Sequence, residues 1–360
     1  MGRWGETARG TRRCSRRSAL QLAAGAAMVG AAGCLRLDGN DASPTVEETF
    51  VTSEKGENID QPAVWHGDDA HLLLVTAKSS HELDVFDAAT GEYLDSIGNE
   101  GAGVVEFDRR NGLYVIDDLA VVVERDNARA QLLRLPEGEP LGTFGEDRLR
   151  KPYEGMVFDG PEGYEIYITD DYDASELSEL DERVKRYRFT ISDDGVDAEH
   201  VNSFGATEEP GALHAVESIY ADPEHDRLMI ADEDDYSMKL YDLGGDFLEV
   251  VTDVFDEGND PEGIALYEND GSGYWVFTEQ AGHDDSLLFE RDRSRFHVFD
   301  RESLEHVATF RGEETANTDG VWLTQTAFGP FPSGAFYAVH DDRTVSAFDL
   351  AEIAKATGID

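Results

Sequence analysis

The chain has only two cysteines in 360 residues, Cys14 and Cys34, and both lie near its N-terminus. The rest of the chain therefore cannot form an internal disulfide, and it offers neither a thiolate metal site nor a cysteine nucleophile. Its ten histidines show no H-E-x-x-H spacing, and no G-x-S-x-G motif occurs. These absences exclude the zinc-protease and serine-hydrolase signatures.

Basic residues are also scarce. Thirty Lys and Arg stand against 77 Asp and Glu, so the formal net charge is −47. A chain without a basic face cannot make the phosphate contacts on which nucleic-acid binding depends, which excludes nucleic acid as a partner. Self-repulsion of this size needs screening by ions, and the composition is typical of proteins from halophilic organisms.

Residues 1–33 differ from the rest because they hold six arginines and one glutamate, ending in an apolar run of small residues. The pair Arg16-Arg17 resembles a twin-arginine export signal, and Ala31-Ala32-Gly33-Cys34 resembles a lipoprotein cleavage box. The alternative is a membrane-spanning helix, but the run falls short of the roughly 20 apolar residues that spanning needs. We therefore predict a signal peptide at 1–33, a lipidated tether at 34–44 and a lipid on Cys34. This predicts a lipoprotein on the outer face of the cytoplasmic membrane.

A strand-turn-strand pattern recurs six times in residues 45–360. Aromatic or aliphatic markers of the repeat are spaced 47 to 58 residues apart, at Phe86, Leu133, Tyr187, Tyr241, Phe299 and Phe348. Each marker follows a short apolar strand, and the period is typical of propeller blades. The sequence thus predicts an all-β, six-bladed β-propeller, with helix only at 174–180 and 350–356.

The ends of this repeat array suggest how the ring closes. Residues 45–52 alternate polar and apolar side chains ahead of the first repeat, whereas the last repeat ends in a helical tail instead of a fourth strand. We predict that Val46–Thr52 pairs with the strand around Val345–Phe348 and completes the sixth blade, because this removes two exposed sheet edges.

Five phrases, in order along the chain, resemble the β-propeller phytases, calcium-dependent enzymes that remove phosphates from inositol hexakisphosphate. They are D-Q-P-A-V-W from Asp60, E-S-I-Y-A-D from Glu217, L-M-I-A-D-E-D from Leu228, D-P-E-G-I from Asp260 with Gln280, and T-D-G-V from Thr318. The second repeat, in contrast, is similar to blades of NHL-type propellers, which are often binding modules.

Superposing the repeats aligns two sets of polar residues at one mouth of the predicted channel. The first ring, at the start of the innermost strands, comprises Asp60, Asn111, Glu154, Glu217, Glu262 and Asp319. The second ring, just after the second strands, comprises Lys78, Arg125, Asp171, Glu233, Gln280 and Asp341. Converging carboxylates repel one another unless a cation compensates them, and carboxylate and amide oxygens suit Ca²⁺. The alternative is that these acids only reflect a composition in which roughly one residue in four is acidic.

The phytase resemblance implies roles for these residues. Metal ligands would be Asp60, Glu217, Glu233, Asp260, Glu262, Gln280 and Asp319. The catalytic set would be Glu217, Asp319, Lys78, Arg125 and Tyr153, with the last three holding phosphate. The implied activity is a calcium-dependent phosphomonoesterase, in which a calcium-bound water attacks an inositol phosphate or another phosphorylated small molecule. We expect a monomer. For Lys78 and Arg125 the alternative is a surface ion pair, and for Tyr153 a packing aromatic.

One position departs from the phytase pattern. Asp171 stands where the phytases place a further lysine that holds phosphate. This departure and the NHL-like second repeat support a second hypothesis, a non-enzymatic propeller that binds a ligand or an envelope protein. A third hypothesis, a calcium-dependent lactonase, shares the metal but lacks the matching phrases.

Overall fold

The computed structural model describes residues 43–193, 195–251, 254–255, 259–280 and 293–359. The predicted signal peptide, Cys34 and nearly all of the tether lie outside these residues. Among the described residues, no helix is long and apolar enough to cross a membrane.

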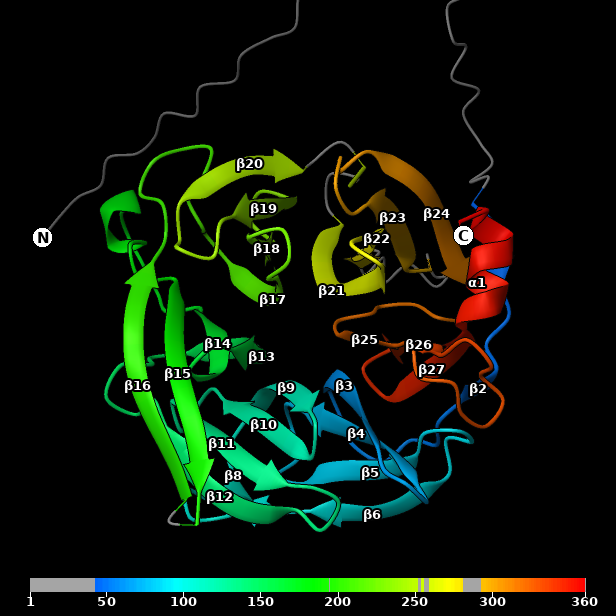
Figure 1. Cartoon of the computed structure of the whole chain (residues 1–360), viewed down its shortest axis with the longest axis horizontal. Coiled ribbons are helices and arrows are strands. Elements are labelled where there is room, and N and C mark those ends of the chain that lie inside the picture. Colours follow the sequence, from blue (N-terminus) through cyan, green and yellow to red (C-terminus); the bar gives the residue numbers. More distant parts are fainter. Residues whose placement is uncertain (1–42, 194, 252–253, 256–258, 281–292, 360) are drawn as a thin grey trace, which may run out of the picture. The chain divides into compact units, whose positions relative to one another are not determined.

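Six antiparallel sheets follow one another around a ring, as the sequence predicts (Figure 1). Blade one contains β3 (Ile59–His66), β4 (His71–Ala77), β5 (Leu83–Asp87) and β6 (Tyr93–Ile97). Blade two contains β9 (Arg110–Ile116), β10 (Leu119–Glu124), β11 (Arg129–Arg134) and β12 (Glu139–Phe144). Blade three contains β13 (Pro152–Gly160), β14 (Gly163–Asp170), β15 (Val184–Ser192) and β16 (Gly195–Phe204).

The second half of the ring repeats this order. Blade four contains β17 (Val216–Asp222), β18 (Arg227–Asp232), β19 (Ser237–Tyr241) and β20 (Phe247–Val251). Blade five contains β21 (Asp260–Asn269), β22 (Ser272–Gln280), β23 (Arg295–Asp300) and β24 (His306–Gly312). Blade six contains β25 (Val321–Thr324), β26 (Ala335–His340) and β27 (Thr344–Asp349). A two-stranded parallel pair, β7 (Asn99–Glu100) and β8 (Glu106–Phe107), lies between blades one and two in sequence.

The innermost strands of successive blades contact one another, and β25 contacts β3, so the ring closes. Each of the six buried apolar clusters joins two neighbouring blades. On β4, for example, Leu73 and Val75 pack toward blade six while Leu74 packs toward blade two. Both faces of the sheet are therefore covered, which explains why the second strands read as continuous apolar runs rather than as alternating patterns.

The predicted closure of the ring is confirmed in part. The strand β2 (Phe50–Val51) pairs antiparallel with β27 and completes blade six, with Phe50 opposite Ala347 and Val51 opposite Ser346. The prediction of one strand over Val46–Thr52 is wrong at its start, because β1 (Thr45–Val46) joins β24 of blade five in parallel. Glu48 separates the two strands: its carboxylate accepts hydrogen bonds from the backbone N–H groups of residues 313–315 and from Thr315 Oγ1.

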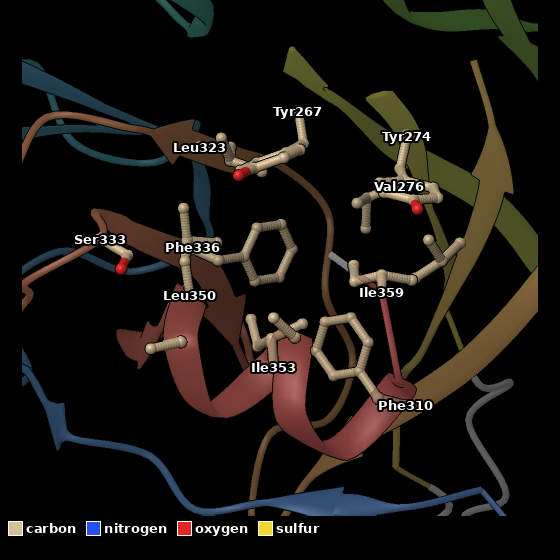
Figure 2. A pocket seen from close by; sticks show the side chains of 13 residues that line it. Tyr267, Tyr274, Val276, Phe310, Leu323, Ser333, Phe336, Leu350, Ile353 and Ile359 are labelled. Atoms are coloured by element: carbon tan, nitrogen blue, oxygen red, sulfur yellow. The ribbon is translucent and has the colours of Figure 1, made fainter. Parts of the chain in front are cut away.

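The predicted tail helix is α1 (Leu350–Thr357). Asp349 caps its N-terminus by accepting a hydrogen bond from the Ala351 N–H, and Gly358 ends it in the left-handed region. The helix packs over blades five and six, where Phe310, Phe336 and Ile353 line an apolar cavity of about 110 Å³ (Figure 2). The helix predicted at 174–180 is only a 3₁₀ turn, Leu177–Glu179.

Candidate functional site

The first and second rings occupy equivalent places in all six blades. In five blades the backbone N–H of the second-ring residue donates to a carbonyl two or three residues before the first-ring residue: Lys78 to Asn58, Arg125 to Arg109, Asp171 to Lys151, Glu233 to Ala215 and Asp341 to Ala316. In blade five, Gln280 pairs with Asp260 in the β21–β22 ladder. The second strand thus holds each second-ring residue beside the start of its own innermost strand.

Glycines bring neighbouring innermost strands together at this mouth. The Gly263 N–H donates to the Asp319 carbonyl at 3.0 Å, and the Gly320 N–H donates to the Asp60 carbonyl at 2.9 Å. A Cβ on Gly320 would lie 2.4 Å from that Asp60 oxygen, so no larger residue fits there without movement. Each glycine directly follows a first-ring acid, and the close approach of the strands therefore concentrates carboxylates near the axis.

A small cavity of about 10 Å³ at the mouth is lined by the innermost strands of all six blades, and several buried polar atoms face it. Asp60 and Asn111 line it and are 4% and 1% exposed. Among the described residues, none offers a hydrogen-bond partner to Asp60 Oδ2, Asn111 Oδ1 or Asn111 Nδ2. Buried polar atoms are normally satisfied, so these two oxygens and one nitrogen are candidate contacts for a bound group.

Lys78 crosses from the second ring to two acids of the first. Its Nζ lies 2.9 Å from Asp60 Oδ1 and 3.0 Å from Asp319 Oδ2. The other oxygen of Asp319 accepts a hydrogen bond from Gln280 Nε2 at 2.6 Å. Burial alone would lower the pKa of Lys78, but the carboxylates of Asp60 and Asp319 outweigh it and raise that pKa. Lys78 is therefore a fixed positive charge among the acids of blades one and six.

Three glutamates of blades four and five meet at the same mouth, near Lys78. Glu217, Glu233 and Glu262 each place one carboxylate oxygen within 4.8 Å of the others. Burial and then Glu233 raise the pKa of Glu217 to about 8, and burial is the largest cause that raises the pKa of Glu233 to about 7. Burial followed by the charge of Glu217 also raises the pKa of Glu262. This trio lacks the countercharge that it needs to be fully ionised at neutral pH.

Tyr153 stands between the two cations that the phytase resemblance assigns to phosphate. Lys78 Nζ lies 5.2 Å from the centre of its ring, and the Arg125 guanidinium lies 5.7 Å from it. Tyr153 is among the neighbours that lower the pKa of Glu217. Tyr153 is thus buried, as a packing aromatic would be, and it also contacts the acidic trio.

The remaining predicted ligand, Asp260, lies at the rim. It is half-buried, and burial followed by the charge of Asp234 raises its pKa. Its charge also contributes to the raised pKa of Glu233. Asp260 is therefore near the trio but is not one of the three residues whose oxygens converge.

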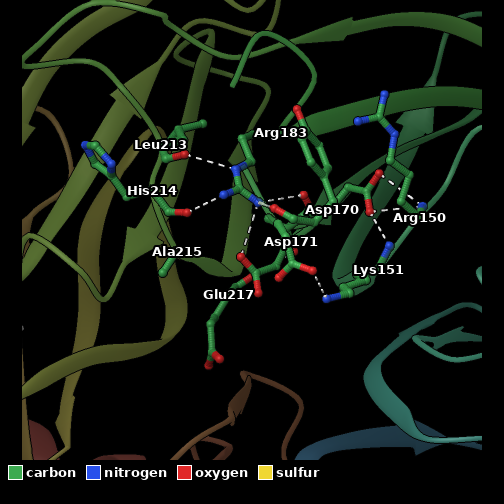
Figure 3. Close-up of polar contacts among 12 residues, drawn as sticks. Arg150, Lys151, Asp170, Asp171, Arg183, Leu213, His214, Ala215 and Glu217 are labelled. Carbon is green, nitrogen blue, oxygen red and sulfur yellow. Dashed lines mark hydrogen bonds and ion pairs between the residues drawn. The ribbon is translucent and has the colours of Figure 1, made fainter. Parts of the chain in front are cut away.

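Asp171 is held by two arginines, one of which the sequence did not single out. Arg125 Nη2 lies 3.4 Å from Asp171 Oδ2, and Arg183 Nη1 lies 3.3 Å from Asp171 Oδ1. Arg183 also donates to the carbonyls of Leu213, His214 and Tyr172, so it fastens blade three to blade four (Figure 3). Only its position just before β15 could have hinted at this role, because the partners are mostly backbone oxygens of a distant segment.

The donor set fits a hard divalent cation. The trio supplies three carboxylates in reach of one another, and Asp60 Oδ2 is buried without a partner among the described residues. Oxygen donors from carboxylates and amides are the ligands that Ca²⁺ takes. The pKa values of the three glutamates are raised because their carboxyl groups lie close together away from solvent. A bound cation would compensate the charge of these carboxylates.

Fold and site together define this protein as a six-bladed β-propeller with a carboxylate-rich mouth. A structural neighbour is a member of the DUF4221 family from Bacteroides vulgatus, with 9% sequence identity, a TM-score of 0.51, and coverage of 85% of this chain and 98% of that one. Hydrazine synthase from Kuenenia stuttgartiensis matches with 10% identity, a TM-score of 0.47, and coverage of 90% and 83%. No protein-family model matches the chain, and no curated protein matches it in sequence. At 9% identity the likeness to the DUF4221 protein shows the fold alone.

Proposed function

We propose that this protein is a calcium-dependent phosphomonoesterase of the β-propeller phytase type, acting on inositol phosphates or another phosphorylated small molecule. The observation that carries the proposal is the trio of Glu217, Glu233 and Glu262, of which Glu262 is buried and the other two are partly buried, near a fixed lysine, Lys78. An anionic substrate needs positive charge at an acidic mouth, and only a bound cation supplies enough of it. The five phytase-like phrases contain Glu217, Glu233 and Glu262. Lys78 lies outside these phrases, but it contacts Asp60 and Asp319, which two of them contain.

Glu217, Glu233 and Glu262 would hold the ion, with Asp60, Asp260, Gln280 and Asp319 around them. When bound, Ca²⁺ lowers the pKa of a coordinated water and neutralises charge on phosphoryl oxygens. No protein nucleophile is then required, in agreement with the lack of a serine or cysteine motif in the sequence.

The chain's own side chains would bind and orient the phosphate. Lys78 is held between Asp60 and Asp319, so its ammonium group has little freedom and can contact a phosphoryl oxygen at a fixed place. Burial and the surrounding acids raise the pKa of Tyr153, which keeps its hydroxyl protonated as a hydrogen-bond donor. Arg125, in contrast, must exchange part of its contact with Asp171 for a contact with substrate.

The direct test is release of inorganic phosphate from inositol hexakisphosphate by the full chain in concentrated salt, with excess Ca²⁺ or with a calcium chelator. We expect release that depends on Ca²⁺ and is not restored by Mg²⁺, which demands a smaller octahedral site. Calcium binding without any phosphate release from inositol phosphates or simple phosphomonoesters would overturn the enzymatic proposal.

Asp171 supports a second candidate, a non-enzymatic propeller that binds a ligand or an envelope protein. Asp171 makes ion pairs with Arg125 and Arg183. Its carboxylate therefore cannot supply the positive charge that a lysine at this position would offer to phosphate. Calorimetric binding of inositol hexakisphosphate without turnover would favour this candidate. Replacing Asp171 by Lys distinguishes the two, since a binding protein gains affinity only, whereas an enzyme changes its rate of phosphate release.

We further propose that the protein is exported by a twin-arginine route and tethered to the membrane through lipid on Cys34. The support is the arginine pair, the short apolar run and the cysteine that ends it. Cys34→Ser should release the protein from the membrane fraction, and unchanged membrane association of this variant would assign the anchor to another segment.

A further inference from the structure

A second constellation of ligating side chains lies at the far end of blade one from the acidic mouth. His66 ends β3 and His71 begins β4, and the two residues are opposite each other across a four-residue turn. Their Nδ1 atoms are 3.0 Å apart. Because β3 starts at the mouth and rises about 3.3 Å per residue, the pair lies roughly 20 Å from Asp60. The acidic trio therefore has no part in it.

The turn that carries the pair is fixed by packing. The Gly67 N–H donates to the Ala70 carbonyl at 2.9 Å. A Cβ on Gly67 would lie 2.2 Å from the Trp65 ring, so the indole and the turn are in close contact. The turn also carries two exposed carboxylates, Asp68 and Asp69. The two imidazoles are thus presented on a preorganised hairpin with oxygen donors on the same loop.

Residues of blade six orient the imidazoles. His66 Nε2 lies 2.7 Å from Thr324 Oγ1, and Thr324 is 8% exposed. The Phe328 ring packs against both histidines, with centroid distances of 4.9 Å to each. When Nε2 of His66 carries the ring proton and donates it to Thr324, the Nδ1 lone pair of His66 accepts the Nδ1 proton of His71. A metal bound to both Nδ1 atoms would replace that proton, with His71 then protonated on Nε2. Such a partner on the second ring nitrogen is the usual support of a metal-binding histidine.

We propose that His66 and His71 form a binding site for a transition-metal ion of square-planar or octahedral preference, Cu²⁺ or Ni²⁺, through their Nδ1 atoms. Two metal–imidazole bonds of about 2.1 Å that meet at a right angle place their nitrogens about 3.0 Å apart, whereas a tetrahedral angle would need about 3.4 Å. The observed separation of 3.0 Å equals the length of an ordinary hydrogen bond between the rings, and it also matches the right angle, so a metal could replace the shared proton with little movement of the rings.

The nitrogen donors also separate this site chemically from the mouth, whose oxygen donors suit hard ions such as Ca²⁺.

The test is electron paramagnetic resonance and calorimetric titration of the full chain with Cu²⁺, with excess Ca²⁺ present to occupy oxygen sites. We expect hyperfine splitting from two imidazole nitrogens. Loss of an outer partner alone costs about 10–100-fold in metal affinity, so loss of the ligand in His71→Ala should weaken binding at least as much and leave one nitrogen. Thr324→Val should weaken Cu²⁺ binding about tenfold while two nitrogens remain.

His200→Ala is the matched control, because His200 is also partly exposed and bonded to a hydroxyl, Ser203 Oγ, but lies on β16. This variant should bind Cu²⁺ as the parent protein does. A parent spectrum with one nitrogen or none, or equal Cu²⁺ affinity of the parent and His71→Ala, would overturn the proposal and leave the pair as a hydrogen bond between two neutral imidazoles. Because His71 lies at the end of a hairpin, circular dichroism of His71→Ala checks that the fold is retained.

Discussion

Asp232 and Glu233 are adjacent in the chain, yet the propeller uses their carboxylates in opposite ways. Asp232 is fully buried; it accepts hydrogen bonds from the backbone of His214 and Ala215 and lies 2.8 Å from Lys239 Nζ. Glu233 faces the mouth, where two other glutamates approach it. Asp232 ends β18 and Glu233 directly follows the strand, so one acid anchors the segment before β17 and the next faces the channel.

Blade three also carries two adjacent acids, but there both have basic partners, Lys185 for Asp170 and the arginines Arg125 and Arg183 for Asp171. Asp170 accepts from the backbone N–H groups of Arg150 and Lys151 and lies 3.4 Å from the buried Lys185 Nζ, whereas Asp171 is the channel-side neighbour (Figure 3). The comparison teaches that burial alone does not mark a functional acid. An acid with a buried base and backbone donors stabilises the fold, and an acid crowded by other acids needs a ligand.

Lys239→Met should give the largest effect, because it leaves the buried Asp232 without its base. We expect a loss of about 3–5 kcal/mol in the free energy of unfolding, measured by urea denaturation in concentrated salt. The matched change at the adjacent acid, Glu233→Gln, should leave the free energy of unfolding unchanged or raise it in calcium-free buffer. A loss below about 1 kcal/mol for Lys239→Met would contradict the structural role of the pair.

Glu262→Gln should come next, since an amide supplies an oxygen but no charge. We expect calcium affinity to fall by about tenfold or more, with a matching loss of calcium-dependent phosphate release. Calorimetric titration in high salt, with Mg²⁺ as competitor, measures the affinity. Equal calcium binding by the parent and this variant would remove Glu262 from the site, and absence of calcium binding in the parent would remove the proposed mechanism.

The pH dependence of stability sharpens the comparison. The pKa of Glu217 is raised to about 8 and that of Glu233 to about 7, from the ordinary glutamate value of 4.5. Between pH 4.5 and these values, the folded protein therefore binds more protons than the unfolded chain. The free energy of unfolding should therefore fall as pH rises through this window in calcium-free buffer, by something of the order of 1 kcal/mol. Thermal denaturation between these limits measures it, and excess Ca²⁺ should flatten the profile. A stability that rises across the window without calcium would refute the assignment.

Asp193→Asn should have the smallest effect. This acid is exposed in the turn between β15 and β16 and belongs to neither kind of buried carboxylate. Calcium affinity should be unchanged within error in the same titration. A clear fall would show that calcium binding follows the overall negative charge rather than the residues of the mouth.

Much of this architecture could be predicted from residue patterns. The spacing of Phe86, Tyr241 and Phe348 gave six blades, and the orphan strand before the first repeat gave the closure through β2. The split between β1 and β2 could not be foreseen, because it depends on Glu48 meeting backbone N–H groups some 265 residues away. The roles of Lys78 and Asp260 at the mouth are still proposals, although the structure places Lys78 beside Asp60 and Asp319 and places Asp260 near Glu233.

The sequence by itself determined the repeat, the strand order and the six positions at which polar residues face the channel, because strand periodicity and turn chemistry are local. Only the tertiary structure decided which of the many acids are neutralised. Asp171 is taken by Arg125 and Arg183, and Asp60 and Asp319 share Lys78, while Glu217, Glu233 and Glu262 are left crowded. Several of these partners come from different blades, as Lys78 and Asp319 or Arg125 and Asp171 do, and the energy of a charge depends on distances and burial that no local pattern contains.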